Sequence, residues 1–264
     1  MENLPETPGQ TLLYKYRSLD TDEQIEFVRD ILVNHRLYYA AIPSLNDPFE
    51  CRAQVSFDAP REVKIQVAID RIRKERPTIS LAEARRLAPA RCKEVERNGP
   101  RNVEALVFGE MGVVSLAGTL NSVPMWSHYA GGHTGLCIEF YAAKESQLDF
   151  FASAFPVNYQ SDLPVLNFYT DHPLDKVRKY LLTKTIDWSY EKEQRILEEN
   201  RYRRQYLDFD PMLVRKVFLG SRISDEHIQT VQSFIGEIPS NVRPILLRAQ
   251  RSHSAYSLEF ERIE

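Results

Sequence analysis

The strongest constraint on the fold is the order of strand-like and helix-like apolar patterns along the chain. Segments with strand character are short and recur along the sequence, but they do not alternate regularly with helices. Strands are predicted at residues 11–17, 36–41, 112–118, 136–140, 153–159, 190–197, 214–219, 243–249 and 255–262. Helices are predicted at residues 21–34, 60–107, 124–130, 173–182 and 225–235. This order favours an α+β fold with a mixed, mainly antiparallel sheet over a doubly wound α/β fold.

Local signals predict where several helices begin and end. Asp20 is expected to cap the first helix, with Glu23 in the capping-box position three residues later. Pro124 suits the first turn of a short helix, because a proline there loses no helical hydrogen bond. Ser224 is expected to cap the last helix, and Gly236 to end it.

The helical stretch at residues 60–107 is unusually basic. We expect it to be an insertion in a single domain of residues 1–264, with breaks at Pro77, Pro89 and residues 98–100. Residues 61–101 hold twelve Lys or Arg and six Asp or Glu, a net charge of +6, whereas the rest of the chain carries −9. Such a segment indicates a surface for a nucleic-acid or protein acceptor, or simply a solvated, arginine-rich helix face.

Composition indicates an intracellular protein without a membrane span. Apolar residues make up 43% of the 264 residues, and no window approaches the roughly 18 uninterrupted apolar residues that a spanning helix needs. The first ten residues have neither the basic nor the apolar region of a secretory signal. Three widely spaced cysteines, Cys51, Cys92 and Cys137, fit a reducing cytoplasm and offer no CxxC zinc site.

Several motifs, in a fixed order, resemble a bacterial family known as domain of unknown function 2971. They are LYKYRSL at 13–19, LYYAAIPSLNDPFE at 37–50, MWSHYAGGHTGLCIEF at 125–140, the residues Lys184, Trp188, Glu191, Glu193 and Arg195 within 184–196, and VFLGSRIS at 217–224. Together they extend over most of the chain. The family name implies no activity by itself.

The same order of motifs also resembles, more distantly, the ADP-ribosyltransferases. That resemblance implies a split sheet, NAD as the substrate, an arginine on the first strand that holds NAD, and a late Glu-x-Glu with the catalytic glutamate. The corresponding residues are Arg17, beside Tyr16, and Glu191 with Glu193. The residue on the central strand is Ser115 or Tyr129, because the chain has no Ser-Thr-Ser triplet at Ser115. A toxin or phage-defence role would follow from analogy alone.

The chemistry of ADP-ribosyl transfer explains why a carboxylate pair attracts attention. Breaking the bond between ribose and nicotinamide passes through an oxocarbenium-like transition state, which a nearby carboxylate stabilises. Glu193 is the candidate for this role and Glu191 for a base toward the acceptor. On a strand at residues 190–197, Glu191, Glu193 and Arg195 would share one face. The alternative is that Glu193 and Arg195 form an ion pair on an exposed strand, which would contribute little to stability. The Glu-x-Glu pattern is also not specific by itself, because it occurs again at residues 94–96 and 259–261.

A second cluster of chemically active residues lies in the short helix at residues 124–130 and just after it. Tyr129 could stack on nicotinamide, and His128 could act as an acid or base. Trp126 and His133 are further candidates for contacts with NAD, or else Trp126 and Tyr129 belong to the core. No metal site is predicted here, because two glycines separate His128 from His133 and remove the geometry of a zincin helix.

Two other function classes remain open from the sequence. A divalent-metal nuclease would use Asp47, Glu50, Glu191 and Glu193 as converging ligands. A binding module without catalysis would use the histidine–aromatic cluster as its pocket. The turn at residues 43–50 is predicted to be an Asx-turn or a loop beside a ligand cleft. Rossmann, P-loop and α/β-hydrolase functions are disfavoured, because GxGxxG, GxxxxGK[ST] and GxSxG are all absent.

Overall fold

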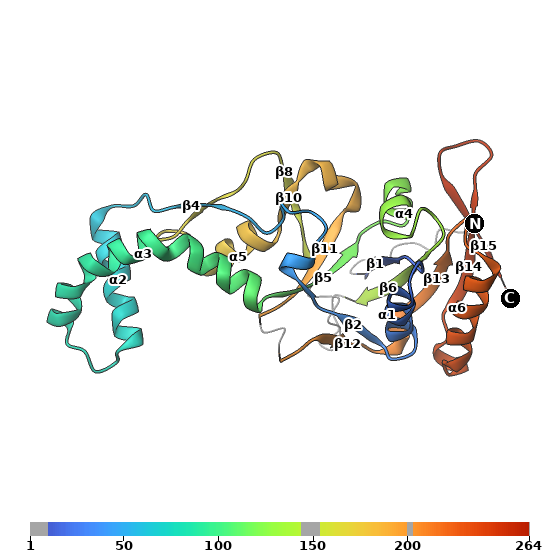
Figure 1. Cartoon of the computed structure of the whole chain (residues 1–264), viewed down its shortest axis with the longest axis horizontal. Coiled ribbons are helices and arrows are strands. Elements are labelled where there is room, and N and C mark those ends of the chain that lie inside the picture. The colour runs from blue at the N-terminus through green and yellow to red at the C-terminus, as the bar shows by residue number, and fades with distance from the viewer. Residues whose placement is uncertain (1–9, 144–153, 200–202, 264) are drawn as a thin grey trace. The chain divides into compact units, whose positions relative to one another are not determined.

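The chain forms two units, and a computed structural model describes residues 10–143, 154–199 and 203–263 of it (Figure 1). We call the first the sheet unit; it comprises residues 1–40, 112–157 and 187–264. We call the second the helical unit; it comprises residues 41–111 and 158–186 and so contains the basic helical stretch.

A long sheet organises the sheet unit. Its strands follow the order β15-β14-β13-β6-β1-β5-β11-β7. All neighbours along this order pair antiparallel except β13 and β14, which are parallel. The strands are β1 (Gln10–Arg17), β5 (Gly112–Ala117), β6 (Leu136–Ala143), β7 (Phe155–Pro156), β11 (Glu193–Glu198), β13 (Val214–Leu219), β14 (Ile245–Arg251) and β15 (Leu258–Arg262). The predicted α+β class with a mixed, mainly antiparallel sheet is therefore confirmed.

The sheet is only weakly joined between β1 and β5. β1 pairs with β6 along its whole length, from Gln10 opposite Ala143 to Arg17 opposite Leu136. By contrast, one register pair, Tyr14 opposite Ala117, connects β1 to β5. The two parts of the sheet are thus joined by a single pair in the strand register.

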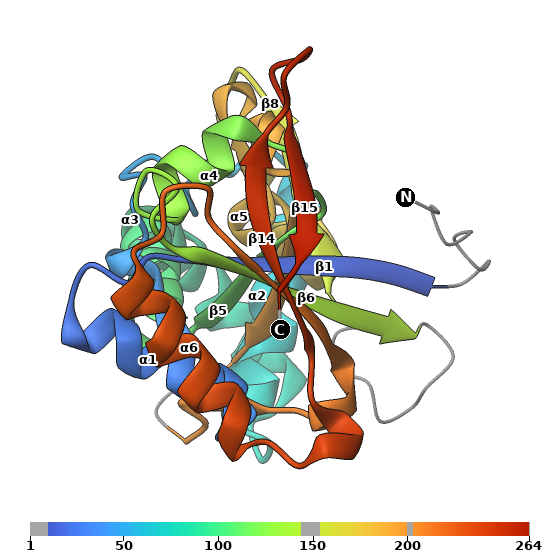
Figure 2. The ribbon, with the colours of Figure 1, turned by 90° about the vertical axis from the view of Figure 1, so that its right-hand side faces the viewer.

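Helices cover the sheet on both faces (Figure 2). Side chains alternate along a strand, so Leu13 and Tyr14 of β1 point to opposite faces. Leu13 belongs to a large apolar core that includes residues of α1 (Asp22–Leu32) and α6 (Asp225–Glu237). Tyr14 belongs to a second core beneath α4 (Val123–Tyr129). The α4 face carries the site described below.

Two predicted helix ends are shifted. Thr21, not Asp20, caps α1, and its hydroxyl accepts a hydrogen bond from the Gln24 amide at 3.3 Å. The Asp20 carboxylate accepts instead from the Ser18 hydroxyl. Ser224 caps α6 as expected, but α6 continues through Gly236, because the packing of its apolar face outweighs the small helix propensity of one glycine.

Two predicted strands of the sheet unit are interrupted. Residues 36–41 form β2 (Arg36–Tyr38) and β3 (Ala40–Ala41), and β2 pairs with β12 (Tyr206–Asp208). The strand expected at residues 153–159 divides into β7 and β8 (Asn158–Gln160), and residue 153 lies outside the described residues. The described residues of the sheet unit also contain the 3-10 turns η3 (Ile186–Glu191), which begins at the last residue of the helical unit, η4 (Pro211–Leu213) and η5 (Ser240–Val242).

A helical pair dominates the helical unit. It consists of α2 (Arg61–Glu75) and α3 (Leu81–Glu110), whose small apolar side chains form a separate core. The predicted break at Pro77 is confirmed, but those at Pro89 and residues 98–100 are wrong, since α3 runs through both. A proline inside a helix costs about 3 kcal/mol, and the packing of Ala84, Ala88 and Cys92 on α2 offsets that cost.

Short elements complete the helical unit. They are η1 (Ile42–Ser44), β4 (Gln54–Ser56), β8, β9 (Val165–Asn167), α5 (Pro173–Leu181) and β10 (Thr183–Thr185). β4 pairs with β9 and β8 with β10, both in parallel. None of the helices in the described ranges is both long and apolar enough to cross a membrane.

Candidate functional site

Tyr129 and Glu191 bring the two richest motifs of the sequence into contact. The Tyr129 hydroxyl, at the end of α4, donates a hydrogen bond of 2.6 Å to Oε1 of Glu191. Glu191 is buried, with 3% of its surface exposed, whereas Tyr129 is half-buried. A hydrogen bond to a carboxylate is among the stronger ones in proteins, so the contact fixes α4 against the segment that precedes β11.

The prediction that Glu191 lies on a strand with Glu193 and Arg195 is wrong. Glu191 ends the 3-10 turn η3, and β11 begins only at Glu193. Lys192, between them, has a φ of 47°. This left-handed residue breaks the two-residue alternation, so Glu191 and Glu193 reach the site from a turn and from a strand, respectively.

Glu193 and Arg195 form a buried ion pair. The Arg195 guanidinium donates from Nε to Oε1 of Glu193 at 2.7 Å and from Nη2 to Oε2 at 3.0 Å. Arg195 is fully buried and Glu193 is 5% exposed. The surface ion pair considered from sequence is therefore not what the structure shows. The two-point contact holds the carboxylate in one orientation.

The sheet register places Ser115 beside this pair. Glu193 lies opposite Ala117, and Arg195 lies opposite Ser115, so all four share the face beneath α4. The Ser115 carbonyl accepts a hydrogen bond from Lys15 Nζ at 2.6 Å. Of the two candidates for the central-strand residue, Tyr129 thus touches a site carboxylate, and Ser115 is the cross-strand neighbour of Arg195.

Trp126 and Tyr16 support α4 from below. Trp126 is fully buried, and its indole nitrogen donates to the Leu120 carbonyl at 3.0 Å. The Tyr16 ring packs edge-on against it at 5.3 Å, and the Tyr16 hydroxyl lies 2.9 and 2.8 Å from the carbonyls of Thr119 and Leu120. Burial raises the pKa of Tyr16, with Cys137 adding to the shift. Both residues are part of the core that positions α4.

Three rings gather at the solvent edge of the site. His128 is exposed, and its ring centroid lies 6.4 Å from Trp188 and 6.3 Å from Tyr190. The rings of Trp188 and Tyr190 lie 5.9 Å apart. We call these three residues the aromatic edge. Trp188 and Tyr190 were not among the site residues predicted from sequence, although their position directly before Glu191 was a usable signal.

His133 follows the two glycines at the end of α4. Gly131 and Gly132 adopt positive φ angles of 57° and 64°, which end α4, and His133 follows with a φ of 74°. Its ring stacks on Trp126 with centroids 6.2 Å apart, and its buried Nδ1 has no hydrogen-bond partner among the described residues. Burial and the nearby Arg222 lower the pKa of His133. The neutral ring is therefore favoured.

Arg17 is not brought together with the carboxylates. It points to the α1 side of the sheet, where its guanidinium carbon lies 5.4 Å from the Phe27 ring centroid. Glu193 faces the α4 side. Burial lowers the pKa of Arg17 to about 10. Burial also lowers the pKa of Lys15. The positive charge of Arg17 lowers this pKa further, whereas the negative charge of Glu193 raises it.

The turn expected at residues 43–50 lies in the helical unit. The Asp47 carboxylate accepts from the Phe49 amide at 2.8 Å, which is the Asx-turn predicted from sequence. Glu50 forms a buried ion pair with Lys184 at 2.9 Å, a partner that sequence reasoning missed. The nuclease hypothesis requires converging metal ligands. Within residues 10–143, 154–199 and 203–263, no group of three or more His, Cys, Asp or Glu has an arrangement that could hold a metal ion.

Comparison with known proteins gave one finding. Residues 125–196 match the model of a family described as a protein of unknown function, DUF2971, which confirms the family resemblance of the sequence. The comparison with curated proteins gave no match, and neither did the comparison with solved structures. The matched segment contains both sides of the site, from α4 to Arg195, whereas Tyr16, Arg17 and Ser115 lie outside it.

Proposed function

We propose that this chain, which matches the model of the DUF2971 family over residues 125–196, is an ADP-ribosyltransferase-like enzyme that uses NAD as its substrate. The observation that carries the proposal is the Tyr129–Glu191 contact beside the Glu193–Arg195 pair. It supplies two neighbouring buried carboxylates, each oriented by a hydrogen-bond donor. A reaction with a positively charged transition state needs such a group.

The chemistry requires different roles for the two carboxylates. Heterolysis of the bond between ribose C1′ and the nicotinamide nitrogen leaves both bonding electrons on nicotinamide, which departs neutral. Positive charge then develops on the ribose, where we assign Glu193 to stabilise it. An acceptor nucleophile attacks C1′ and loses a proton, which we assign to Glu191 as base. In this scheme Arg195 and Tyr129 are positioning residues.

The aromatic edge suits the nicotinamide end of the substrate. His128, Trp188 and Tyr190 offer ring faces at the solvent boundary, and planar heterocycles stack favourably on such faces. A binding module without catalysis would use the same three rings but would have no need of the carboxylates. Nicotinamide release therefore distinguishes the two functions.

The weak junction between β1 and β5 is a further point in favour of the proposal. A split sheet is what the resemblance to ADP-ribosyltransferases implies, and here a single register pair joins the two parts. The Arg17 guanidinium, on the other face, makes no ion pair among the residues that the structure describes. We therefore place the catalytic role at α4 and β11 and give Arg17 no contact with the reacting ribose.

The test is incubation of the purified full-length chain with NAD, followed by quantification of free nicotinamide. We expect time-dependent release from NAD and none from NADH, because the reduced ring carries no positive charge and is a poor leaving group. Absence of release from NAD, together with absence of NAD binding by calorimetry, would refute the proposal.

Tyr129→Phe is expected to slow nicotinamide release about 10-fold or more. The substitution removes the hydroxyl that donates to Glu191, and a hydrogen bond to a charged group contributes about 1.5–3 kcal/mol. Tyr256→Phe is the matched control, because Tyr256 is fully exposed on the loop between β14 and β15. Equal rates of nicotinamide release for the wild type and both variants would show that the Tyr129 hydroxyl has no role in the reaction.

A further inference from the structure

One side of α3 carries a row of cations that faces away from its packing partner. Ala84, Ala88 and Cys92 recur every four residues and pack on α2. Arg86, Lys93, Arg97 and Arg101 are separated by seven, four and four residues, so they fall on the opposite side of a helix with 3.6 residues per turn. We call these four residues the basic stripe. All four are exposed, and the stripe is about 22 Å long at 1.5 Å per residue.

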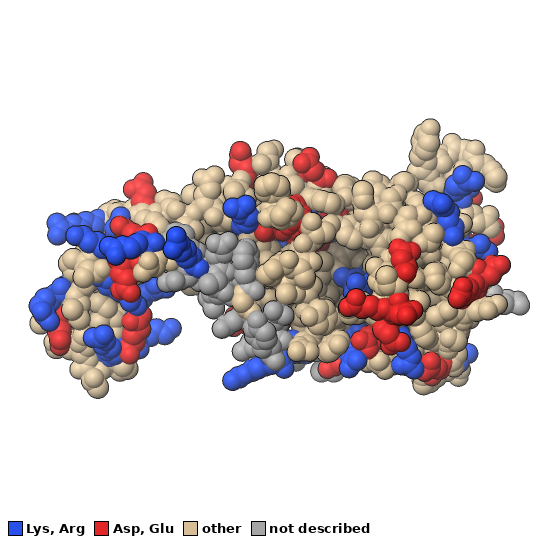
Figure 3. All heavy atoms as spheres, in the orientation of Figure 1, with Lys and Arg blue, Asp and Glu red and all other residues tan. Residues whose placement is uncertain are grey.

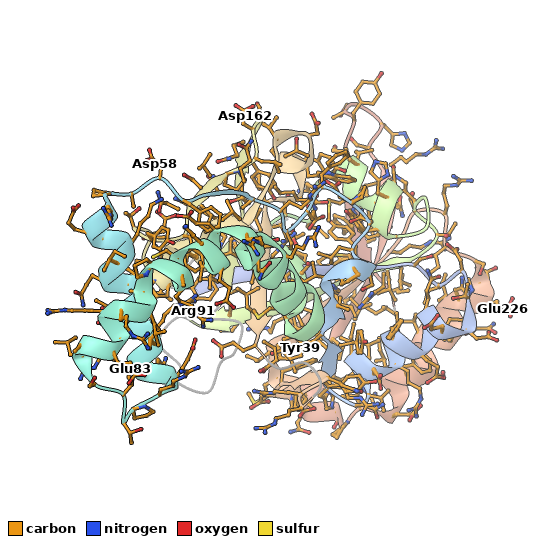
Figure 4. All side chains as sticks on the ribbon, turned by 60° about the vertical axis from the view of Figure 1, so that its left-hand side comes forward. Tyr39, Asp58, Glu83, Arg91, Asp162 and Glu226 are labelled. Carbon is orange, nitrogen blue, oxygen red and sulfur yellow. The ribbon has the colours of Figure 1, made fainter. Side chains whose placement is uncertain are left out.

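Three acidic side chains of the helical pair form ion pairs with cations outside the stripe. Arg91, which is labelled in Figure 4, pairs with Glu75 and, at 3.0 Å, with Glu94. Lys64 pairs with Glu96 at 2.8 Å. Glu83 reaches the stripe only through a 4.0 Å contact with Arg86.

The remaining three cations of the stripe lack such partners. Among the side chains that the structure describes, none forms an ion pair with Lys93, Arg97 or Arg101. The space-filling view shows Lys and Arg side chains gathered over the helical pair (Figure 3). Among the described side chains, the stripe is therefore a surface with an excess of positive charge on one face of a helix.

We propose that the basic stripe binds the phosphate backbone of a nucleic acid. A row of exposed guanidinium and ammonium groups on one helix face matches a polyanion with regularly repeated charges, and arginine donates two parallel hydrogen bonds to phosphate. A membrane surface fits less well, because a helix that lies in a bilayer needs an exposed apolar face, and Ala84, Ala88 and Cys92 of α3 are buried against α2. Binding of nucleic acid by the stripe does not depend on the proposed function. The inference rests on the proposed function only where it makes the bound nucleic acid the acceptor of the ADP-ribosyl group.

The test measures binding of the full-length chain to a fluorescent single-stranded RNA and a DNA duplex of about 20 nucleotides per strand, by anisotropy between about 50 and 200 mM salt. The variant Lys93→Gln/Arg97→Gln/Arg101→Gln should weaken binding about 10-fold or more at low salt. It should also reduce the slope of log K against log salt by about 2–3, because three phosphate contacts are lost. The RNA and DNA arms identify the preferred strand form.

The matched control is Arg73→Gln/Lys74→Gln/Arg76→Gln. These exposed residues at the end of α2 have the same composition, so both variants lose the same charge from the same unit. An equal loss of binding in both variants, no binding by the wild type, or binding to polyglutamate in preference to either nucleic acid would overturn the proposal. Nicotinamide release without nucleic acid, measured on the same variants, should be unchanged. Failure of NAD chemistry would therefore be seen separately from failure of the stripe.

Discussion

Glu193→Gln is expected to slow nicotinamide release from NAD by about 100- to 1,000-fold, the loss typical when one electrostatic stabiliser of a transition state is removed. Glutamine keeps the size of the side chain and one carbonyl oxygen that can still accept from Arg195. It loses the negative charge that we assign to the stabilisation of the ribose cation. Steady-state kinetics should show the loss in kcat with little change in KM, because the group acts mainly in the transition state.

Glu259→Gln is the control for this prediction. Glu259 belongs to another Glu-x-Glu triplet of the chain and is exposed on β15. Circular dichroism and the midpoint of thermal unfolding establish that the Glu193 variant is folded before its rate is interpreted. A folded Glu193 variant with the rate of wild type would show that the carboxylate has no catalytic role.

Arg195→Met is expected to lower the free energy of unfolding by about 3–5 kcal/mol. The substitution removes a fully buried guanidinium and, with it, the two-point contact that Arg195 makes with the buried carboxylate of Glu193. Methionine approximates the volume of the aliphatic part of arginine, so the loss arises mainly from the removed charged contacts. Urea denaturation followed by tryptophan fluorescence measures it.

The double variant Glu193→Gln/Arg195→Met serves as the comparison. Removal of both charges takes away the two ions that pair with each other, so part of the lost stability should return. A single-variant loss below about 1 kcal/mol would indicate an exposed pair, which contradicts the buried geometry. Unfolding data thus test the structure of the site independently of any reaction.

The sequence predicted the elements of the sheet well because their patterns are local. The alternation in β6 and the apolar run of β5 each determine a strand without reference to distant residues. The boundary at β11 was not predictable in this way. Tyr190 and Glu191 fit a strand pattern, but they lie in η3, and the left-handed Lys192 separates them from β11. The feature that marks this turn is a tertiary contact, the hydrogen bond from Tyr129 to Glu191, which no local pattern reveals.

The residue types of the candidate site stand out in the sequence, whereas the contacts between them do not. Glu191, Glu193 and Tyr129 were singled out by residue type and order, and the structure brings them into one region. The outcome for Arg17 shows the limit of such reasoning. Its neighbour Tyr16 and Glu193 face the α4 side, and the face reached by a strand residue depends on a register that no short motif encodes.

The most direct test of the claim that α4, η3 and β11 form the NAD site is to locate the segments that NAD contacts. Hydrogen–deuterium exchange of the full-length chain, with and without saturating NAD, reports this for each segment without requiring turnover. We expect slower exchange in α4, residues 123–129, and in η3 and β11, residues 186–198, with no change in α6, residues 225–237. Protection confined to other segments, or none anywhere at saturating NAD, would contradict the assignment of this site.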